Sequence, residues 1–195
     1  MGSDGLAGQA PLTSTLRAFF GLPVPDGQRE RLEFFLQRCA AAAPDFRWTD
    51  AHNLHLTVRF IGAIESDLVD EIANRVEEAP GPSFEVALGE MGMFKRGRLA
   101  RVVWLGLREG GDELSRLAER VERECQAVHL EAESRPFTAH LTLARARPRD
   151  GALVPPLPDL PDLESWRAEE LVLYSSHLGR DGAVHEPIRR IRLTG

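Results

Sequence analysis

The sequence predicts an α+β protein with one domain, built from two similar lobes around a shared cleft. Three observations support this fold class. Stretches with the two-residue repeat of β-strands alternate along the chain with stretches that have helical spacing. The same short pattern occurs twice, at His55 and at His140, 85 positions apart (140 − 55). No linker-like stretch divides the 195 residues, a length that allows one core or two lobes sharing a core.

The first half of the chain predicts strand, helix, strand and helix. Residues 17–22 form an apolar run that ends at Pro23, which indicates a buried strand. Asp26 is expected to cap a helix that reaches about Ala43, and residues 46–49 are expected to be extended. Residues 53–61 alternate, and Gly62 is expected to end that strand, with a helix following over 66–78. The expected apolar face is Leu54, Leu56, Val58 and Phe60, and the polar face is His55, Thr57 and Arg59.

In the second half, a helix again accompanies the strand that contains the histidine. Strands are predicted at 84–88 and 100–107, on either side of a glycine-rich basic loop at 92–99. A helix is expected over 112–128, then a strand over 137–144 with Thr138, His140 and Thr142 on one side. The remaining expectations are a proline-rich loop at 153–161, closing strands at 166–176 and 184–193, a turn at 180–182, and a flexible tail at 1–15 before one domain at 16–195.

Composition narrows the class of protein. Hydrophobic residues make up 43% and charged residues 28%, as in ordinary soluble proteins. No apolar run approaches the roughly 20 residues that span a bilayer, and the N-terminus lacks a secretory pattern, so we expect a cytoplasmic protein without a membrane partner, and a monomer by default. The two cysteines, Cys39 and Cys125, lie in helical patterns and are expected to be reduced and buried.

The charge pattern indicates a small phosphate ligand. A net charge of −6 argues against electrostatic binding of a long duplex. Only Lys95 among the 24 basic residues is a lysine, and arginine's planar fork suits phosphate oxygens. A general preference for arginine would give the same composition, so composition alone does not decide. The arginines cluster at Arg96, Arg98 and Arg101, at Arg145, Arg147 and Arg149, and at Arg189, Arg190 and Arg192.

The repeated pattern carries the predicted chemistry. His-Leu-Thr-Val at 55–58 and His-Leu-Thr-Leu at 140–143 each place a histidine and a threonine on one face of a strand. In-line cleavage of a phosphodiester needs a base on the entering oxygen and an acid on the leaving oxygen, and histidine can serve as either near neutral pH. The threonine hydroxyls can donate to non-bridging oxygens. The alternative is four half-exposed strand residues without a catalytic role.

The remaining histidines suggest no further chemistry. His52 and His55 have no carboxylate at a matching strand position, so we expect neither a metal nor a cofactor. His177 and His185 flank the last predicted turn and are expected to be solvent-exposed.

Together with these motifs, stretches such as Arg17-Ala18-Phe19-Phe20, Asn53–Gly62, Arg101–Gly106 and Arg135–Arg145 resemble a known family. The chain resembles the two-histidine phosphoesterases, and among them the bacterial and archaeal RNA 2′,3′-cyclic phosphodiesterases, historically called 2′-5′ RNA ligases. The resemblance covers about residues 16–193. It departs from the family at Ala139, where proline usually precedes the second histidine.

The resemblance implies two antiparallel sheets around a central cleft, with helices outside. It implies metal-independent hydrolysis of a terminal 2′,3′-cyclic phosphate to a 2′-phosphate, with RNA ends or cyclic nucleotides as substrates. His55 would protonate the leaving 3′-oxygen and His140 would activate water. Arg145 would hold the phosphate, and Phe94, in the basic loop, would meet the base or ribose. Arg59 shares the His55 face and is either a second phosphate ligand or a charge at the cleft rim.

Two other functions stay open at this point. The same site would join 2′-5′ linkages if an RNA 5′-hydroxyl replaced water, and nothing in the sequence separates that ligase from a hydrolase. A non-catalytic protein that binds RNA ends is the third reading, and the two intact motifs argue against it.

Overall fold

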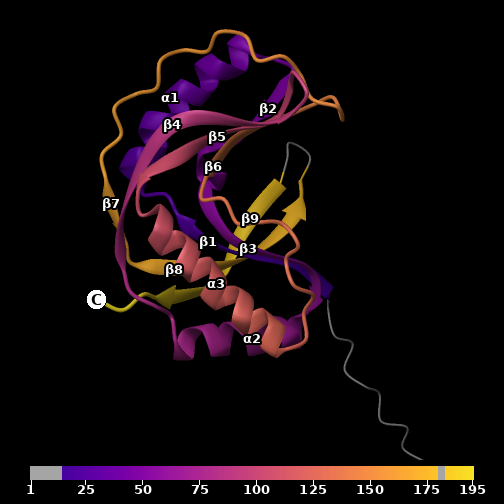
Figure 1. Cartoon of the computed structure of the whole chain (residues 1–195), viewed down its shortest axis with the longest axis vertical. Coiled ribbons are helices and arrows are strands. Elements are labelled where there is room, and N and C mark those ends of the chain that lie inside the picture. The colour runs from indigo at the N-terminus through magenta and orange to yellow at the C-terminus, as the bar shows by residue number, and fades with distance from the viewer. Residues whose placement is uncertain (1–14, 180–182) are drawn as a thin grey trace, which may run out of the picture.

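The computed structural model describes residues 15–179 and 183–195 (Figure 1). The expected tail therefore lies outside the described residues, apart from Thr15, and so does the turn expected at 180–182. The elements are β1 (Thr15–Pro23), α1 (Asp26–Ala42), β2 (Phe46–Trp48), the 3₁₀ helix η1 (Ala51–Asn53), β3 (His55–Glu65), α2 (Ser66–Glu78), β4 (Phe84–Arg96), β5 (Leu99–Glu109), α3 (Gly111–Ala127), β6 (Leu141–Ala146), β7 (Trp166–Ala168), β8 (Glu170–Leu178) and β9 (Ala183–Arg192).

The named strands form one curled antiparallel sheet in the order β7-β4-β5-β6-β3-β1-β8-β9, with β2 added to β6. Its two halves meet where β3 lies beside β6, and the paired register there is a single residue pair, Leu56 opposite Leu141. The prediction of an α+β fold with antiparallel strands and outer helices is confirmed. The two expected sheets are joined at that pair, which we call the seam.

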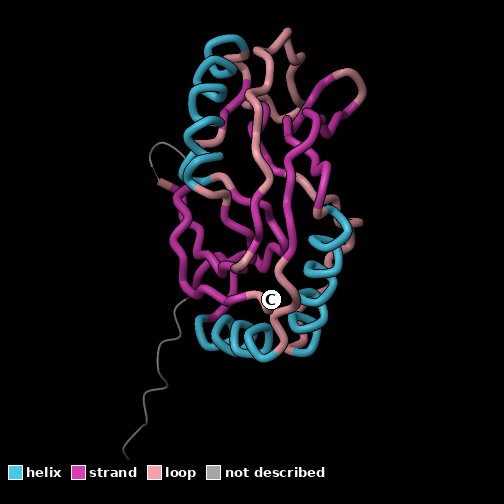
Figure 2. The backbone as a smooth tube through the Cα atoms, turned by 90° about the vertical axis from the view of Figure 1, so that its left-hand side faces the viewer, coloured by secondary structure: helices cyan, strands magenta, loops and turns pink. Residues whose placement is uncertain are grey.

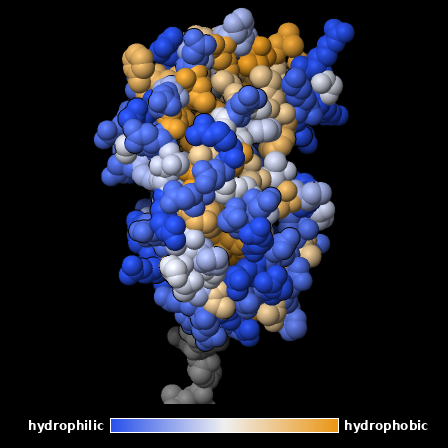
Figure 3. All heavy atoms as spheres, turned by 60° about the vertical axis from the view of Figure 1, so that its left-hand side comes forward, coloured by the Kyte–Doolittle hydropathy of each residue, from blue (hydrophilic) through white to orange (hydrophobic). Residues whose placement is uncertain are grey.

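The three α-helices of the described chain lie on the outside of the sheet (Figures 1 and 2). α1 lies at one end of the molecule beside β2, and α2 and α3 lie together at the other end against β3. α2 buries Val69, Ile72, Ala73 and Val76, which have the spacing of one helical face. Figure 3 shows one face of the molecule, covered mostly by hydrophilic side chains with hydrophobic ones gathered toward its upper end. None of the described helices is long and apolar enough to cross a membrane.

Several predicted elements are confirmed. Cys39 and Cys125 are free and buried. The helix predicted at 66–78 has those bounds, and the helix predicted at 112–128 differs by one residue at each end. Gly110 precedes the latter with a φ of 85°, and a Cβ there would meet the backbone oxygen of Glu85, so glycine allows this helix to begin against β4.

Other boundaries were wrong for local reasons. Asp26 is the first residue of α1 and follows the N-cap Pro25, so its side chain does not cap the helix. Gly62 does not end β3, because its φ of 85° fits an irregularity inside the strand. A second irregularity, where the register shifts between Phe20 and Gly21 of β1, turns Phe60 outward, to 48% exposure, although alternation predicted it in the core.

The second half has three further corrections. The loop predicted at 92–99 is mostly strand, so Phe94 lies on β4 beside Val102 of β5. The strand predicted at 137–144 begins only at Leu141, and His140 lies just before it. The strand predicted at 166–176 is two strands that separate after Ala168, because β7 pairs with β4 while β8 pairs with β1.

Candidate active site

The seam brings the two His-x-Thr motifs together. Leu56 and Leu141 are fully buried, and each follows a motif histidine directly. In this antiparallel register, the positions beside the seam place His55 opposite Thr142 and Thr57 opposite His140. All four lie on the face away from the buried leucines. Diagonal neighbours across such a pair have backbones about 7–8 Å apart, so the two motif histidines lie near each other on that face.

The two histidines have the same local anchor. Nδ1 of His55 lies 2.7 Å from the backbone oxygen of Asn53, and Nδ1 of His140 lies 2.7 Å from that of Thr138. In each case the acceptor is two residues earlier in the chain. A carbonyl oxygen only accepts, so each Nδ1 carries the hydrogen and each neutral ring leaves Nε2 as a proton acceptor. The two rings are therefore prepared for acid–base chemistry in the same way.

Different aromatic surroundings hold the two rings. His55 packs against Phe19, with ring centroids 4.6 Å apart. His140 meets the edge of Phe94 at 5.0 Å and lies 6.1 Å from Trp104. Phe94, expected to contact substrate, therefore lies beside the second histidine. Its ring is 37% exposed.

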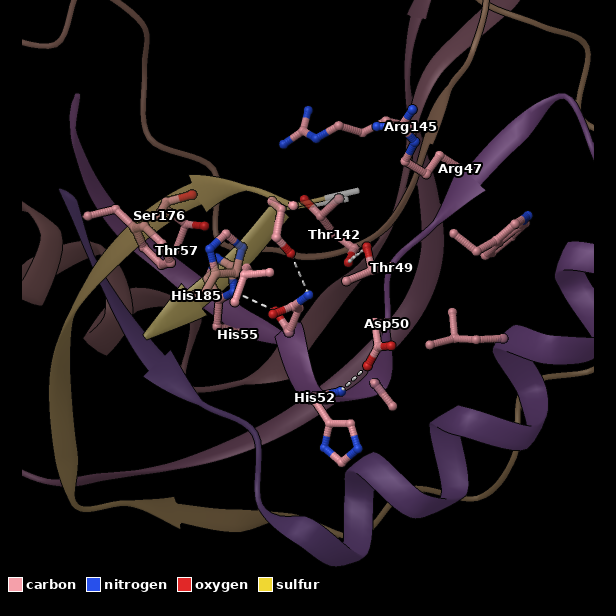
Figure 4. Close-up of a pocket in the computed structure, with 18 of the residues that line it drawn as sticks. Arg47, Thr49, Asp50, His52, His55, Thr57, Thr142, Arg145, Ser176 and His185 are labelled. Carbon is pink, nitrogen blue, oxygen red and sulfur yellow. Dashed lines mark hydrogen bonds between the residues drawn. The ribbon is translucent and has the colours of Figure 1, made fainter. Parts of the chain in front are cut away.

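Two adjoining hollows open on the motif residues. The first, of about 940 Å³, is lined by His55, Thr57, Thr142, Arg145 and His185, among others (Figure 4). The second, of about 770 Å³, is lined by His140, Phe94 and Arg59, again with Thr57 and Arg145. Because Thr57 and Arg145 line both hollows, the two meet at the motifs. We call them the first cavity and the second cavity.

Arg145 reaches this junction because β6 is irregular. Leu143 and Ala144 are both fully buried, which breaks strict alternation and places Arg145 on the cavity side. Figure 4 shows its side chain extending above Thr142 toward the histidines. Strict alternation from His140 and Thr142 would place Arg145 on the opposite, apolar face. The positive charge of Arg145 acts on both imidazoles and lowers the pKa of each.

Arg59 lines the second cavity, but the protein itself occupies its guanidinium. Nε pairs with the Glu122 carboxylate of α3, one terminal nitrogen donates to the Phe60 backbone oxygen, and the other donates to that of Glu131 at 2.8 Å. The Arg59 side chain is only 11% exposed. These contacts connect β3 to α3 and to the segment after it.

His185 was missed by sequence reasoning. The expectation that it is solvent-exposed was wrong. It is partly buried on β9, lines the first cavity, and its ring lies 4.9 Å from that of Phe19. The sequence hides this because β9 reaches His55 only through β8 and β1, a strand order that no local pattern reveals. His177, by contrast, is exposed as expected, with a 53% exposed side chain.

Burial is the main influence on both motif histidines. It lowers the pKa of His55 to about 4, with further lowering by the charges of His185, Arg145 and His140, while the hydrogen bond to Asn53 acts in the opposite direction. Burial also lowers the pKa of His140, which again has an opposing backbone hydrogen bond. Both rings are therefore neutral at pH 7 when no ligand is bound.

Comparison with known proteins shows the family of this chain. Residues 24–180 match the family model described as 2′-5′ RNA ligase superfamily. The chain belongs to that superfamily. A relative from Aeropyrum pernix, named RNA 2′,3′-cyclic phosphodiesterase, is 32% identical over 144 residues, which cover 72% of this chain and 82% of the relative. An Escherichia coli relative with the same name is 30% identical over 183 residues, covering 91% of this chain and 97% of the relative.

Solved structures share the fold of this chain. The structure of Escherichia coli LigT complexed with 3′-AMP is 27% identical, with a TM-score of 0.79, and the match covers 93% of this chain and 100% of that one. A Thermus thermophilus protein at 24% identity has a TM-score of 0.77, with 92% of this chain and 99% of that one covered. The shared fold therefore extends over nearly the whole chain.

Proposed function

We propose that this protein is a phosphodiesterase that opens the terminal 2′,3′-cyclic phosphate of RNA to a 2′-phosphomonoester. His55 and His140 would act as the acid–base pair. The observation that carries the proposal is their matched setting: equal Nδ1 anchors, one buried seam between them, and two cavities that meet at the motifs. Relatives that carry the name of this activity match this chain over most of their length, which supports the same substrate class.

The remaining motif groups suit the phosphate. The hydroxyls of Thr57 and Thr142 can donate to the two non-bridging oxygens, one from each half of the fold. Arg145, at the junction of the cavities, can neutralise the charge that these oxygens carry. These three side chains would stabilise the transition state more than the ground state, because negative charge concentrates on the phosphoryl oxygens during attack.

The pKa values suit the assigned roles. Once protonated, His55 is the stronger acid of the two because its pKa is about 4, which favours proton transfer to the leaving 3′-oxygen. His140, with the smaller depression of its pKa, is the better base for the attacking water. The anionic phosphate raises both pKa values when it binds, which favours protonation of an imidazole in the complex.

The test is hydrolysis of an RNA oligonucleotide that ends in a 2′,3′-cyclic phosphate, with a chelator present and with the product isomer identified. We expect a 2′-phosphate product, and a rate lower by about 10² or more in His55→Ala and in His140→Ala. His177→Ala is the matched control, because His177 is exposed and lines neither cavity. Undiminished turnover in either motif variant would remove that histidine from the mechanism.

A reversible 2′-5′ RNA ligase is the second candidate, and the second cavity favours it. That cavity lies on the His140 side, where the attacking group enters, and it is lined by the exposed rings of Phe60, Phe94 and Phe137. Such rings can stack with bases, so an RNA 5′-hydroxyl could enter there in place of water, with Phe94 against its base or ribose. Incubation of two RNA halves followed by linkage analysis separates the two activities. Binding of RNA ends without turnover of either kind would support the non-catalytic alternative.

We also propose that the protein acts in the cytoplasm as a monomer, with residues 16–195 as one domain. Light scattering of the purified protein checks the monomer. A second copy in solution would contradict it.

A further inference from the structure

Two arginines lie opposite each other on the first cavity. β2 pairs with β6 so that Arg47 is the direct partner of Arg145. Residues that face each other in an antiparallel pair point to the same side of the sheet, and like charges in that position repel. Both residues line the first cavity, and Figure 4 shows them together at its upper edge.

Nothing in the described part of the chain neutralises this pair. Neither arginine forms an ion pair there. The acids that line the first cavity are engaged elsewhere, because Asp50 accepts from the backbone of His52 and Glu33 accepts from Gln37. A bound anion would relieve the repulsion between the two guanidinium groups.

The two arginines differ in their distance from the reaction centre. Arg145 lines both cavities and its charge acts on both motif histidines. Arg47 lines only the first cavity, at the part formed by β2 and η1, where Asp50 and His52 also lie. Arg145 is therefore placed for the reacting phosphate, and Arg47 lies on the neighbouring strand, farther from the motif histidines.

The orientation of the bound nucleotide in the first cavity follows from the proposed function, on which this inference rests. If His55 protonates the leaving 3′-oxygen, the ribose lies on the His55 side, in the first cavity. A volume of about 940 Å³ accommodates a nucleotide. The 5′-oxygen of that ribose then continues away from the histidines, toward the Arg47 end.

We propose that Arg47 binds the phosphate on the 5′ side of the terminal nucleotide, while Arg145 binds the cyclic phosphate. Arg47 thereby selects substrates with this second phosphate, namely RNA ends and 5′-phosphorylated nucleotides, over nucleoside 2′,3′-cyclic phosphates. The guanidinium fork suits this contact, since it can donate two hydrogen bonds to one phosphate.

The kinetic test compares adenosine 2′,3′-cyclic phosphate with the dinucleotide ApA carrying a 2′,3′-cyclic phosphate. In Arg47→Gln, we expect KM for the dinucleotide to rise about 10-fold or more, with kcat unchanged, because one charge-assisted contact is lost. KM for the nucleoside substrate stays the same. Arg192→Gln is the charge-matched control, since Arg192 is exposed on β9 and lines neither cavity. An equal effect on both substrates, or no effect on either, overturns the proposal.

A binding measurement keeps the inference separate from the proposed reaction. Titration calorimetry with adenosine 2′,5′-bisphosphate and adenosine 2′-phosphate needs no turnover. We expect Arg47→Gln to weaken the bisphosphate about 10-fold and to leave the monophosphate unchanged. Equal affinities of the wild-type protein for both compounds would refute the second phosphate site, whereas failure to open any cyclic phosphate would refute only the proposed function.

Discussion

The ring of His185 stands edge-on against the ring of His55, with centroids 5.2 Å apart and planes at 90°. Phe19 touches both rings, and Tyr174 stacks on Phe19 at 5.0 Å. Nδ1 of His185 is buried and has no hydrogen-bond partner among the described residues. His55 is thus held by a second imidazole whose charge acts on it directly.

Replacing His185 should change the acidity of His55. In His185→Gln, a polar side chain remains but its positive charge is lost, so we expect the pKa of His55 to rise from about 4. NMR titration of the imidazole resonances measures this. His177→Gln serves as the control, because the charge of His177 acts on His185 and not on His55. An unchanged His55 titration in His185→Gln would contradict the coupling.

The pH dependence of the reaction follows from the two depressed pKa values. One imidazole has to be protonated and the other neutral, and in the free protein both pKa values lie below 6.5. We therefore expect kcat/KM to peak below pH 6.5 and to fall about tenfold per unit above the higher pKa. The kcat profile should lie at higher pH, because bound phosphate raises both pKa values. A kcat/KM optimum above pH 7 would show that the free imidazoles are not depressed.

The two motif threonines should contribute to the rate by nearly equal amounts. Thr57→Val and Thr142→Val keep the side-chain shape and remove the hydroxyl. Each should lower kcat by about 10²–10³, the range found for single transition-state donors. Steady-state kinetics with KM measured separately tests this. Thr194→Val, which removes a hydroxyl bonded to Gly81 far from both cavities, should leave kcat unchanged.

Arg59 should matter more for stability than for substrate binding. Breaking its pair with Glu122 leaves that partly buried carboxylate without its cation, so Arg59→Met should lower the free energy of unfolding by about 1–3 kcal/mol. Urea unfolding measures this. The control is Arg116→Met, because the Arg116–Glu113 pair is exposed and should change stability by less than about 1 kcal/mol. A variant of Arg59 that folds normally but has a raised KM would instead favour the phosphate-binding role.

Local patterns predicted much of the site. Alternation around His55 placed that histidine and Thr57 on one face, and the structure has both lining the first cavity. The helices at 66–78 and 112–128 were predictable because the spacing of their apolar residues and the residues at their starts both indicate a helix.

Features that depend on strand order or irregular strands could not be predicted. Phe60 leaves the core because of an irregularity in the β1–β3 register, which no propensity encodes. Arg145 faces the cavity for a similar reason in β6. Arg47 reaches the site on β2, whose partner β6 lies far along the chain, and His185 reaches it because β8, the hairpin partner of β9, pairs with β1, and such pairing is decided by the tertiary fold.

Two unreactive residues at the seam set the relative positions of the two motifs. Leu56 and Leu141 are the one register pair between β3 and β6 in the described chain, and the motif residues proposed to react lie directly beside them. A slip of one position would rotate one His–Thr set into the interior and leave the other behind. A substitution of either leucine could therefore abolish activity while all four motif side chains are still present, because they would no longer face the same phosphate.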